Sequence, residues 1–486
     1  MNSQISKLFA FIVVLFAVIV GFSSNWSVFA AEELEGKRVN KRPLLEQQQI
    51  ERGRILAADG TVIARSIPRG QGDDLTYHRV YPTGTLFGHP IGYSYVERSN
   101  SEFEQFHNDE LAGEEDEFTS ILDELEGKAQ EGNDVVSTLD AAAQQIALDQ
   151  LSAQGNGAVV AMEPDSGRIR VMASWPPFDP NEVPRRFGQL ATDEAAPLLN
   201  RATQGQYPPG STFKVVTATA GLDSGVITPD STIDSPAVLT VQGQPLANSD
   251  GTSYGPIPLS TGLTFSVNTY FAQLGLEVGQ DVLFEYMDRF GFGSKPQIDL
   301  PSDQVFTSGV YDFESGEFLD EDDSVDLARI AFGQERLLVT PLQMAEVAAA
   351  VANSGTLMRP RLWDRVIDPD GRLRDRMDPQ PQSEVMSEDT AAELTEAMTA
   401  VVQEGTGTAA ALSGIDVAGK TGTADVESRE ECGALTDANQ AWFIGFAPAE
   451  DPEIAVAATI ECTTGFGGEV AAPIAASVMQ EILAGG

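Results

Sequence analysis

The fold of this chain is limited most strongly by the position of its strand patterns, which lie at the two ends of one long segment, residues 135–486. Residues 157–174, G-A-V-V-A-M-E-P-D-S-G-R-I-R-V-M-A-S, predict two apolar strands around a Pro-Asp-Ser-Gly turn. Three more strands are expected near the chain end, at 416–425, 440–447 and 453–461, before a helix from about residue 470. Helical segments are expected between the two groups, at about 211–225, 260–275 and 340–354. The pattern predicts an α+β domain over residues 135–486, with an antiparallel sheet built from both ends of the segment.

An apolar run opens the chain. Residues 8–22 are apolar throughout and follow Lys7, and with residues 23–31 they reach the roughly 20 residues that a membrane span needs. Val28-Phe29-Ala30 also resembles a cleavage site for signal peptidase. We expect an uncleaved transmembrane anchor over residues 1–31, with Lys7 on the cytoplasmic side, and a cleaved signal peptide is the alternative. Both interpretations place residues 32–486 outside the cytoplasm.

Residues 32–134 form a separate amino-terminal module. Within it, R-G-R-I-L-A-A-D-G-T-V-I-A-R at 52–65 predicts a hairpin, because Asp59-Gly60 is a strong turn signal between alternating strands. The module shows no catalytic set of residues. We expect a non-catalytic, β-rich pedestal that serves as a docking or dimerisation surface.

The charge of the chain excludes some partners. The formal net charge is -43 and the sequence pI is about 4.2. Binding to DNA or RNA needs clustered Lys and Arg, so a nucleic-acid partner is not expected. The acidity fits either a very soluble protein or a surface adapted to high salt, where carboxylate repulsion is screened.

Lysine and histidine are scarce where the catalytic chemistry is expected. From residue 135 onward the only lysines are Lys214, Lys295 and Lys420. The three histidines all precede residue 108, so a Ser-His-Asp triad cannot form within the α+β domain. No metal motif and no cofactor motif is present. We interpret Lys295, which precedes Pro296, as an ordinary loop cation.

Y-P-P-G-S-T-F-K at 207–214 contains a candidate nucleophile. The Pro-Pro-Gly turn puts Ser211 at a helix start, and Lys214 lies three residues later on the same helix face. A buried lysine with a lowered pKa can take the serine proton. An S-x-x-K match alone is weak, and a cation on a helix face is the plain alternative.

Two further motifs follow in order. Ser266-Val267-Asn268 lies 55 residues after Ser211, and Lys420-Thr421-Gly422 lies 154 residues after Ser266. Taken singly, the first could cap a helix and the second could end a strand. The ordered set S-x-x-K, S-x-N, K-T-G is the signature of serine penicillin-binding proteins and related β-lactamases.

The resemblance to class B penicillin-binding proteins extends over nearly the whole chain. The anchor, residues 52–65 and R-V-Y-P-T-G resemble the amino-terminal module of that family. Residues 157–176, 333–355 and 441–448 resemble the opening of its transpeptidase domain, its long internal helix and the strand after K-T-G. The modest length is most similar to the short penicillin-binding protein A group. Glu335 stands where a smaller residue is expected after Gly-Gln.

The resemblance implies a role for each motif residue. Ser211 would attack the penultimate D-alanine of a peptidoglycan stem peptide, and Lys214 would accept its proton. Ser266 would relay protons and Asn268 would hold the substrate backbone. The backbone N–H groups of Ser211 and Thr423 would form the oxyanion hole. Carboxylate and substrate binding would fall to the strand residues Lys420, Thr421, Gly422 and Thr423.

The family also implies partners and competing functions. β-Lactams would acylate Ser211, and a SEDS-type glycan polymerase in the membrane is the expected protein partner, with a role in cell division rather than elongation. A β-lactamase or a D,D-carboxypeptidase would resolve the acyl-enzyme with water instead of an amine. An inert scaffold or a β-lactam sensor is the non-enzymatic alternative, which the intact motifs disfavour.

Cys432 and Cys462 are the only two cysteines. In an exported domain a disulfide between them is plausible, and two buried free thiols are the alternative. Consecutive hairpins would put the loop with Cys432 and the strand end with Cys462 at the same end of the sheet. A bridge would then have to cross two strand spacings, about 9–10 Å, so the loop would have to fold over.

Overall fold

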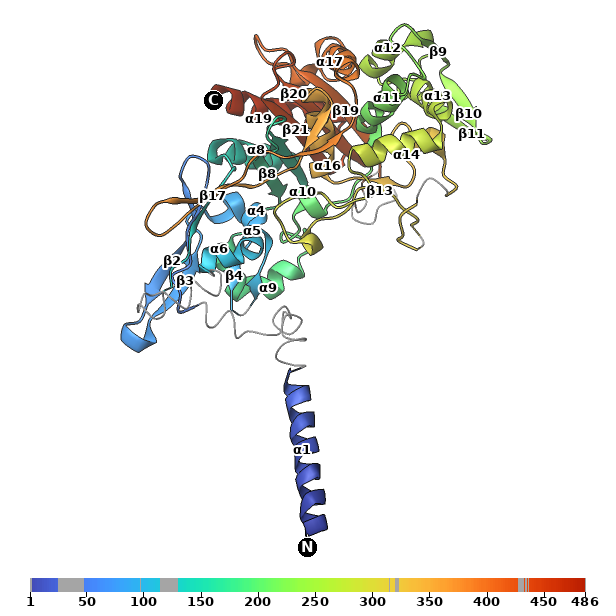
Figure 1. The fold of residues 1–486 in the computed structure, drawn as a ribbon. Coiled ribbons are helices and arrows are strands. Elements are labelled where there is room, and N and C mark those ends of the chain that lie inside the picture. Colours follow the sequence, from blue (N-terminus) through green and yellow to red (C-terminus); the bar gives the residue numbers. More distant parts are fainter. Residues whose placement is uncertain are drawn as a thin grey trace.

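A computed structural model gives the fold of the chain (Figure 1). It describes residues 2–24, 48–96, 98–113, 130–313, 315–319, 323–426, 432, 435 and 437–485.

The centre of the fold is a five-stranded sheet in the order β19-β20-β21-β7-β8. All neighbouring pairs are antiparallel. The strands are β7 (Gly157–Met162), β8 (Ile169–Trp175), β19 (Ala418–Asp425), β20 (Asn439–Ala447) and β21 (Ile454–Thr463). The sheet therefore combines strands from both ends of the domain, as the sequence predicts. It leaves β19, which carries Lys420-Thr421-Gly422, as an edge strand.

Helices cover both faces of this sheet. Alternating side chains of a strand belong to different core clusters: Val159 packs with α8 (Ala141–Gln154) and α19 (Ala472–Gly485), while Val160 packs with α16 (Pro341–Ala352). This alternation is the period of two that a strand imposes. Asp140 caps α8 by accepting hydrogen bonds from Ala142 N and Ala143 N, which fixes where the helix begins.

The middle of the domain supplies most of the remaining helices (Figure 1). They are α9 (Val183–Ala191), α10 (Arg201–Gln204), α11 (Lys214–Asp223), α12 (Leu259–Thr264), α13 (Asn268–Val278), α14 (Gln280–Arg289), α15 (Leu327–Ile330) and α17 (Glu388–Gln403), with the short α18 (Gly467–Val470) before α19. Short two-stranded pairs connect them: β9 (Thr232–Ser235) with β12 (Gly255–Pro258), β10 (Val238–Val241) with β11 (Gln244–Ala247), β13 (Gly309–Val310) with β14 (Leu337–Leu338), and β15 (Thr356–Met358) with β18 (Pro381–Glu384).

A second sheet belongs to the amino-terminal module and has six strands in the order β17-β16-β6-β1-β2-β3. These are β1 (Ile55–Leu56), β2 (Val62–Arg69), β3 (Thr76–Val80), β6 (Asp134–Ser137), β16 (Trp363–Ile367) and β17 (Leu373–Arg376). Small elements complete the module: α4 (Gly88–Ile91), β4 (Ser94–Tyr95), β5 (Ser99–Asn100), α5 (Glu102–Phe106) and α6 (Asn108–Ala112).

The hairpin predicted at 52–65 is present as β1 and β2, and Gly60 takes the positive φ of 88° that its turn requires. The strands β16 and β17 come from a segment assigned by sequence to the catalytic domain. Trp363 pairs with Ser137 and Val366 pairs with Val135, so this distant hairpin extends the sheet of the module.

The apolar run at the start of the chain lies in α1 (Asn2–Ser24). Among the residues that the structure describes, no helix is both long and apolar enough to cross a membrane, and residues 1 and 25–31 of the predicted anchor lie outside them.

Candidate functional site

The Ser211 turn is a single 3-10 turn, η5 (Gly210–Phe213), directly before α11. Gly210 has a φ of 54° and donates its N–H to the carbonyl of Gly333 at 2.9 Å. In the opposite direction, a Cβ on Gly333 would lie only 1.8 Å from the carbonyl oxygen of Gly210, so the two backbones are in direct contact. In the described part of the chain the half-buried Ser211 hydroxyl makes no hydrogen bond, which leaves it free for a substrate.

Lys214 is the first residue of α11 and is completely buried. Its Nζ donates to the carbonyl oxygen of Ser266 at 2.8 Å, to Ser266 Oγ at 3.1 Å and to Asn268 Oδ1 at 2.7 Å. The rings of Phe271 and Phe332 lie 5.5 and 6.0 Å from the same nitrogen. Burial lowers the pKa of the Lys214 amine well below its usual value, and the charge of Lys420 lowers it further. A lysine in this environment can act as a base near neutral pH.

Ser266 lies between α12 and α13 in a left-handed backbone conformation with a φ of 57°. Such strain in a residue other than glycine is concentrated at functional sites. Ser266 Oγ accepts hydrogen bonds from Lys214 Nζ and from Lys420 Nζ, the latter at 2.9 Å. Because both acceptor lone pairs of the hydroxyl are then occupied, its proton is left to donate elsewhere.

The strand β19 brings the K-T-G residues to this cluster. Lys420 is buried and also donates to the carbonyl of Thr421 at 3.0 Å, and burial lowers its pKa to about 7. A Cβ on Gly422 would lie 2.7 Å from the Pro209 carbonyl oxygen, so the absence of a side chain lets the edge strand pack against the Ser211 turn.

Two threonine hydroxyls on β19 have partners in neighbouring loops. The hydroxyls of Thr421 and Thr406 are 2.6 Å apart, and Thr423 Oγ1 accepts from the backbone N–H of Gly467 at 3.1 Å. A Cβ built on Gly210 would meet the backbone nitrogen of Thr423 at 3.1 Å. The two segments of the predicted oxyanion hole, around Ser211 and Thr423, are therefore in contact.

The structure thus brings the three motifs together. Lys214, Ser266, Asn268 and Lys420 form one hydrogen-bonded cluster, and Ser211 lies one turn before Lys214. Lys295 is not part of it, because its Nζ donates to the carbonyl of Ser302.

The two cysteines form a disulfide, with their Cα atoms 5.1 Å apart. Cys432 lies in the connection between β19 and β20, and Cys462 lies near the end of β21. Their pairing confirms the disulfide that the sequence made plausible.

Some residues that shape the site gave no signal in the sequence. Gly333 supports the Ser211 turn, and Tyr207, Glu461 and Arg201 form a polar network. Glu335 has a φ of 69°, which explains why a smaller residue is expected at that position.

Comparison with known families decides the assignment. Residues 157–480 match the penicillin binding protein transpeptidase domain, and residues 52–135 match the penicillin binding protein A dimerisation domain. The chain belongs to the penicillin-binding protein transpeptidases. More narrowly, it is a class B member, with an amino-terminal dimerisation module and a serine transpeptidase domain.

Relatives of this penicillin-binding protein match over the full length. The peptidoglycan D,D-transpeptidase PbpA of Mycolicibacterium smegmatis is 32% identical, with 99% of each chain covered. PbpA of Mycobacterium tuberculosis is 32% identical over 100% of both chains. The ceftriaxone acyl-enzyme complex of penicillin-binding protein A from M. tuberculosis has a TM-score of 0.80 at 31% identity, covering 90% of this chain and 99% of that one. A D,D-transpeptidase domain from Eggerthella lenta has a TM-score of 0.77 at 35% identity, with 90% and 99% covered.

Proposed function

We propose that this penicillin-binding protein is a peptidoglycan D,D-transpeptidase that crosslinks stem peptides through an acyl-enzyme on Ser211. The observation that carries the proposal is the buried Lys214 amine, whose lowered pKa and contact with Ser266 make it a base beside the nucleophile. The relatives named as D,D-transpeptidases, which match over full length, support the same reaction.

The reaction has two steps. Ser211 Oγ forms a bond to the carbonyl carbon of the penultimate D-alanine while Lys214 accepts the hydroxyl proton. The bond from that carbon to the terminal D-alanine nitrogen breaks, and Ser266, which bridges Lys214 and Lys420, passes a proton to the leaving amine. The nitrogen of an amine from a neighbouring stem peptide then forms a bond to the ester carbon, the bond from that carbon to Ser211 Oγ breaks, and the proton lost by the amine returns to Ser211 Oγ through Lys214.

The substrate contacts follow from the same cluster. The cation of Lys420 and the hydroxyls of Thr421 and Thr423 on β19 would hold the terminal carboxylate of the donor. Asn268 would donate from its amide to the peptide backbone. The backbone N–H groups of Ser211 and Thr423 would stabilise the oxyanion, a contribution often worth about 3–4 kcal/mol.

A fluorescent penicillin tests the function. A β-lactam mimics the donor peptide, so we expect a stable covalent adduct on the wild type and none on Ser211→Ala. Rapid turnover of the label would favour the competing β-lactamase function, and absence of label on the wild type would contradict both. Released D-alanine and crosslinked product from a stem-peptide donor with an amine acceptor would separate transpeptidation from carboxypeptidation.

We also propose that residues 32–486 lie outside the cytoplasm, on the outer side of the cell membrane. The disulfide between Cys432 and Cys462 supports this location, because disulfides persist in oxidising compartments. A septal role and a SEDS-type glycan polymerase as partner of the amino-terminal module follow from the family. Co-purification with such a polymerase, lost on deletion of the module, would test the partner.

A further inference from the structure

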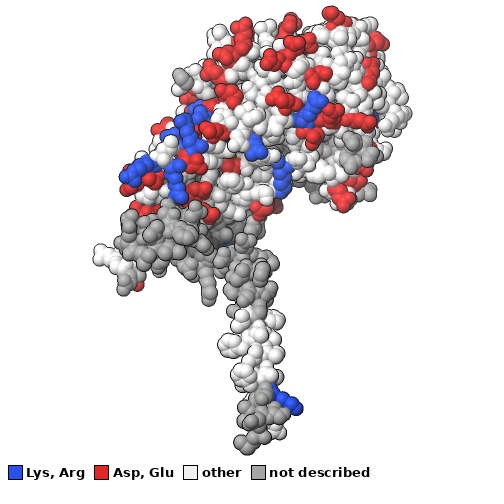
Figure 2. Space-filling model, in the orientation of Figure 1, with Lys and Arg blue, Asp and Glu red and all other residues white. Residues whose placement is uncertain are grey.

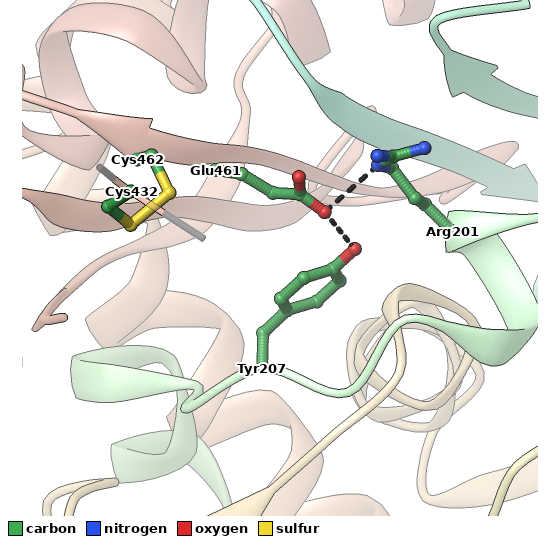
Figure 3. The surroundings of a disulfide bond; sticks show 5 residues. All are labelled: Arg201, Tyr207, Cys432, Glu461 and Cys462. Carbon is green, nitrogen blue, oxygen red and sulfur yellow. Dashed lines mark hydrogen bonds and ion pairs between the residues drawn. A yellow bond between two sulfur atoms is a disulfide. The ribbon is translucent and has the colours of Figure 1, made fainter. Parts of the chain in front are cut away.

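A polar network joins Tyr207, Glu461 and Arg201 (Figure 3). The Tyr207 hydroxyl donates to Glu461 Oε1, and Arg201 Nε donates to the same oxygen at 3.0 Å. Tyr207 is 5% exposed, the Arg201 side chain 4% and the Glu461 side chain 17%, so the carboxylate is mostly shielded from water although it borders a cavity. Hydrogen bonds to a charged acceptor in such surroundings are among the stronger ones in proteins.

Arg201 is itself fixed by the backbone. Its Nη1 donates to the carbonyl of Ala196 at 3.2 Å and its Nη2 to that of Ala195 at 3.0 Å. Because both terminal nitrogens of the guanidinium are bound to backbone carbonyls, the Arg201 side chain is fixed, and its hydrogen bond fixes the Glu461 carboxylate. The network therefore transmits the position of Glu461 to Tyr207.

Glu461 points at Tyr207 because β21 has a bulge there. Ile460 pairs with Ala441 and Thr463 pairs with Asn439, so Glu461 and Cys462 together oppose the single residue Gln440. Cys462 takes a φ of 47° in this bulge. A bulge changes the direction of a side chain relative to the regular alternation of a strand.

The disulfide holds this bulge. Cys462 follows Glu461 directly and is bonded to Cys432, and Figure 3 shows the bridge beside the Glu461 backbone. Both cysteines line a cavity of about 860 Å³, so a small reductant can reach them.

Tyr207 connects the network to the nucleophile, because it lies four residues before Ser211. Its backbone exchanges two hydrogen bonds with Val339, at 2.9 and 2.8 Å, and Trp442 Nε1 donates to the next carbonyl, that of Pro208, at 3.0 Å. These contacts fix the backbone of the segment, and the Glu461 contact fixes the Tyr207 ring against it. Two prolines, whose φ angles are fixed, then lead to Gly210 and Ser211, so the backbone between the Tyr207 ring and the nucleophile has little conformational freedom.

We propose that Glu461, held by the disulfide-anchored bulge of β21, is a positioning residue for Ser211 and acts through the Tyr207 hydroxyl. The inference rests on the proposed function, since it concerns the rate at which Ser211 is acylated. Glu461 does not touch the substrate. It sets where the Ser211 turn lies relative to β19 and the Lys214 amine.

The test measures the limiting acylation rate separately from the binding constant, using a fluorescent penicillin and the full-length protein. Glu461→Ala and Tyr207→Phe should each lower the limiting rate by about tenfold to a hundredfold, the range expected when a reacting group moves by up to about 1 Å. Glu461→Gln should recover most of the rate, because an amide oxygen can still accept both hydrogen bonds. The double variant should lose no more than either single one, since both remove the same contact.

Glu163→Ala is the matched control. Glu163 also pairs with arginines, Arg168 and Arg170, and its side chain is 18% exposed against 17% for Glu461. It should lower the melting temperature without changing the limiting acylation rate. Equal rates in the wild type, Glu461→Ala and Tyr207→Phe would overturn the positioning role alone, whereas a wild type that takes no label overturns the proposed function as well.

Reduction tests the part played by the disulfide. A reductant should slow acylation of the wild type, and Cys432→Ser should show the slower rate with no further response to reductant. If the Glu461→Ala rate falls while reduction leaves the wild-type rate unchanged, the disulfide does not hold the positioning residue and that half of the proposal is wrong.

Discussion

Two lysine amines share one hydroxyl in this active site, and their surroundings assign them different tasks. Lys214 has three oxygen acceptors around its Nζ and two aromatic rings nearby, and within the described part of the chain no carboxylate pairs with it. Burial therefore destabilises the charged form of Lys214, and none of these contacts supplies an anion that would offset the effect. Lys420 lies on the far side of Ser266, and burial lowers its pKa to about 7, so a nearby substrate carboxylate would favour its charged form. At the scale of residues, the two amines differ in what lowers their pKa: burial and the charge of Lys420 act on Lys214, whereas burial alone acts on Lys420.

The first prediction concerns Lys214 as the base. Lys214→Arg keeps the charge but cannot lose its proton, so acylation of Ser211 should fall by at least about a hundredfold, the usual contribution of a general base. In the wild type the folded-state pKa of the amine is lowered, so acylation should be retained at neutral pH and should decline on acidification as the amine becomes protonated. Stopped-flow measurements with a fluorescent penicillin across pH give both results. The matched control is Lys295→Arg, whose cation lies in a loop, and it should acylate like the wild type.

At the scale of elements, the site is assembled by close backbone packing. β19 approaches the Ser211 turn at Gly422, and the segment after α15 approaches it at Gly333. α16 packs against one face of the central sheet, and nearly every side chain of this helix is buried, including Glu346. Elements this tightly packed tolerate neither added atoms nor unpaired charges, and both properties can be tested.

The contact at Gly333 predicts that adding one methyl group there strongly lowers the free energy of unfolding. A Cβ there would lie 1.8 Å from the Gly210 carbonyl oxygen, at a φ of 87°. Gly293 has a similar φ of 79° and nothing within 4 Å of its Cβ position, so it separates backbone strain from the clash. Gly293→Ala should lower the free energy of unfolding by about 1 kcal/mol. Gly333→Ala should cost more than about 2 kcal/mol and should also slow Ser211 acylation. Equal losses in urea unfolding, or normal acylation in folded Gly333→Ala, would contradict the role of this contact.

The buried carboxyl of α16 predicts a pH dependence of stability. Burial raises the pKa of Glu346 to about 8, and its Oε1 has no hydrogen-bond partner. The native state therefore holds a proton that the unfolded chain releases above its ordinary pKa of 4.5. The stabilising contribution is complete below that value and is lost as the pH rises through about 8.

Glu346→Gln removes this titration. Relative to the wild type, the variant should gain about 1–3 kcal/mol in free energy of unfolding between acidic and mildly alkaline pH. The comparison is made by urea unfolding at several pH values, with the exposed Glu404→Gln as control. A difference between variant and wild type that does not change with pH would show that Glu346 is ionised in the folded protein.

The sequence predicted the local elements and the central sheet, but not the pairing of the distant β16–β17 hairpin or the backbone contacts of the site. The strand alternation and the S-x-x-K, S-x-N and K-T-G spacing led to the central sheet and to the residues that cluster on Ser266. The hairpin of β16 and β17 gave no such signal, because β17 is exposed along its whole length and pairs far from its place in the sequence. Glu461 was missed because a bulge breaks the period of two on which the strand prediction depends. Contacts between backbones, such as Gly333 with Gly210, depend on a fold that no local pattern contains.

At the scale of the whole molecule, charge is the dominant property. Acidic side chains number 73 against 30 basic ones. Figure 2 shows acidic groups spread across the visible face of the catalytic domain, with basic groups gathered on the side of β2 and β17. Repulsion among these carboxylates opposes the compact state, and dissolved salt screens it over about 10 Å at 0.1 M and about 3 Å at 1 M. A surface of this kind suits a high-salt habitat.

The last prediction is that added KCl or NaCl raises the melting temperature of the protein. The origin of the effect can be tested on α17, where Glu393 has its pKa raised by burial and by the charges of Asp389 and Glu396. Like charges at this helical spacing destabilise by about 0.2–0.5 kcal/mol, so Glu393→Gln should stabilise by a few tenths of a kcal/mol at low salt and hardly at all near 1 M.

Glu182→Gln removes an attraction instead of a repulsion, so its effect on stability should have the opposite sign. Glu182 pairs with Arg186 at 2.5 Å across one turn of α9. This variant should lose stability at low salt, and the loss should shrink as salt is added. If both variants respond to salt in the same direction, the salt acts through hydration of the whole surface rather than by screening. If the melting temperature of the wild type does not rise with salt, the proposed adaptation to high salt is wrong.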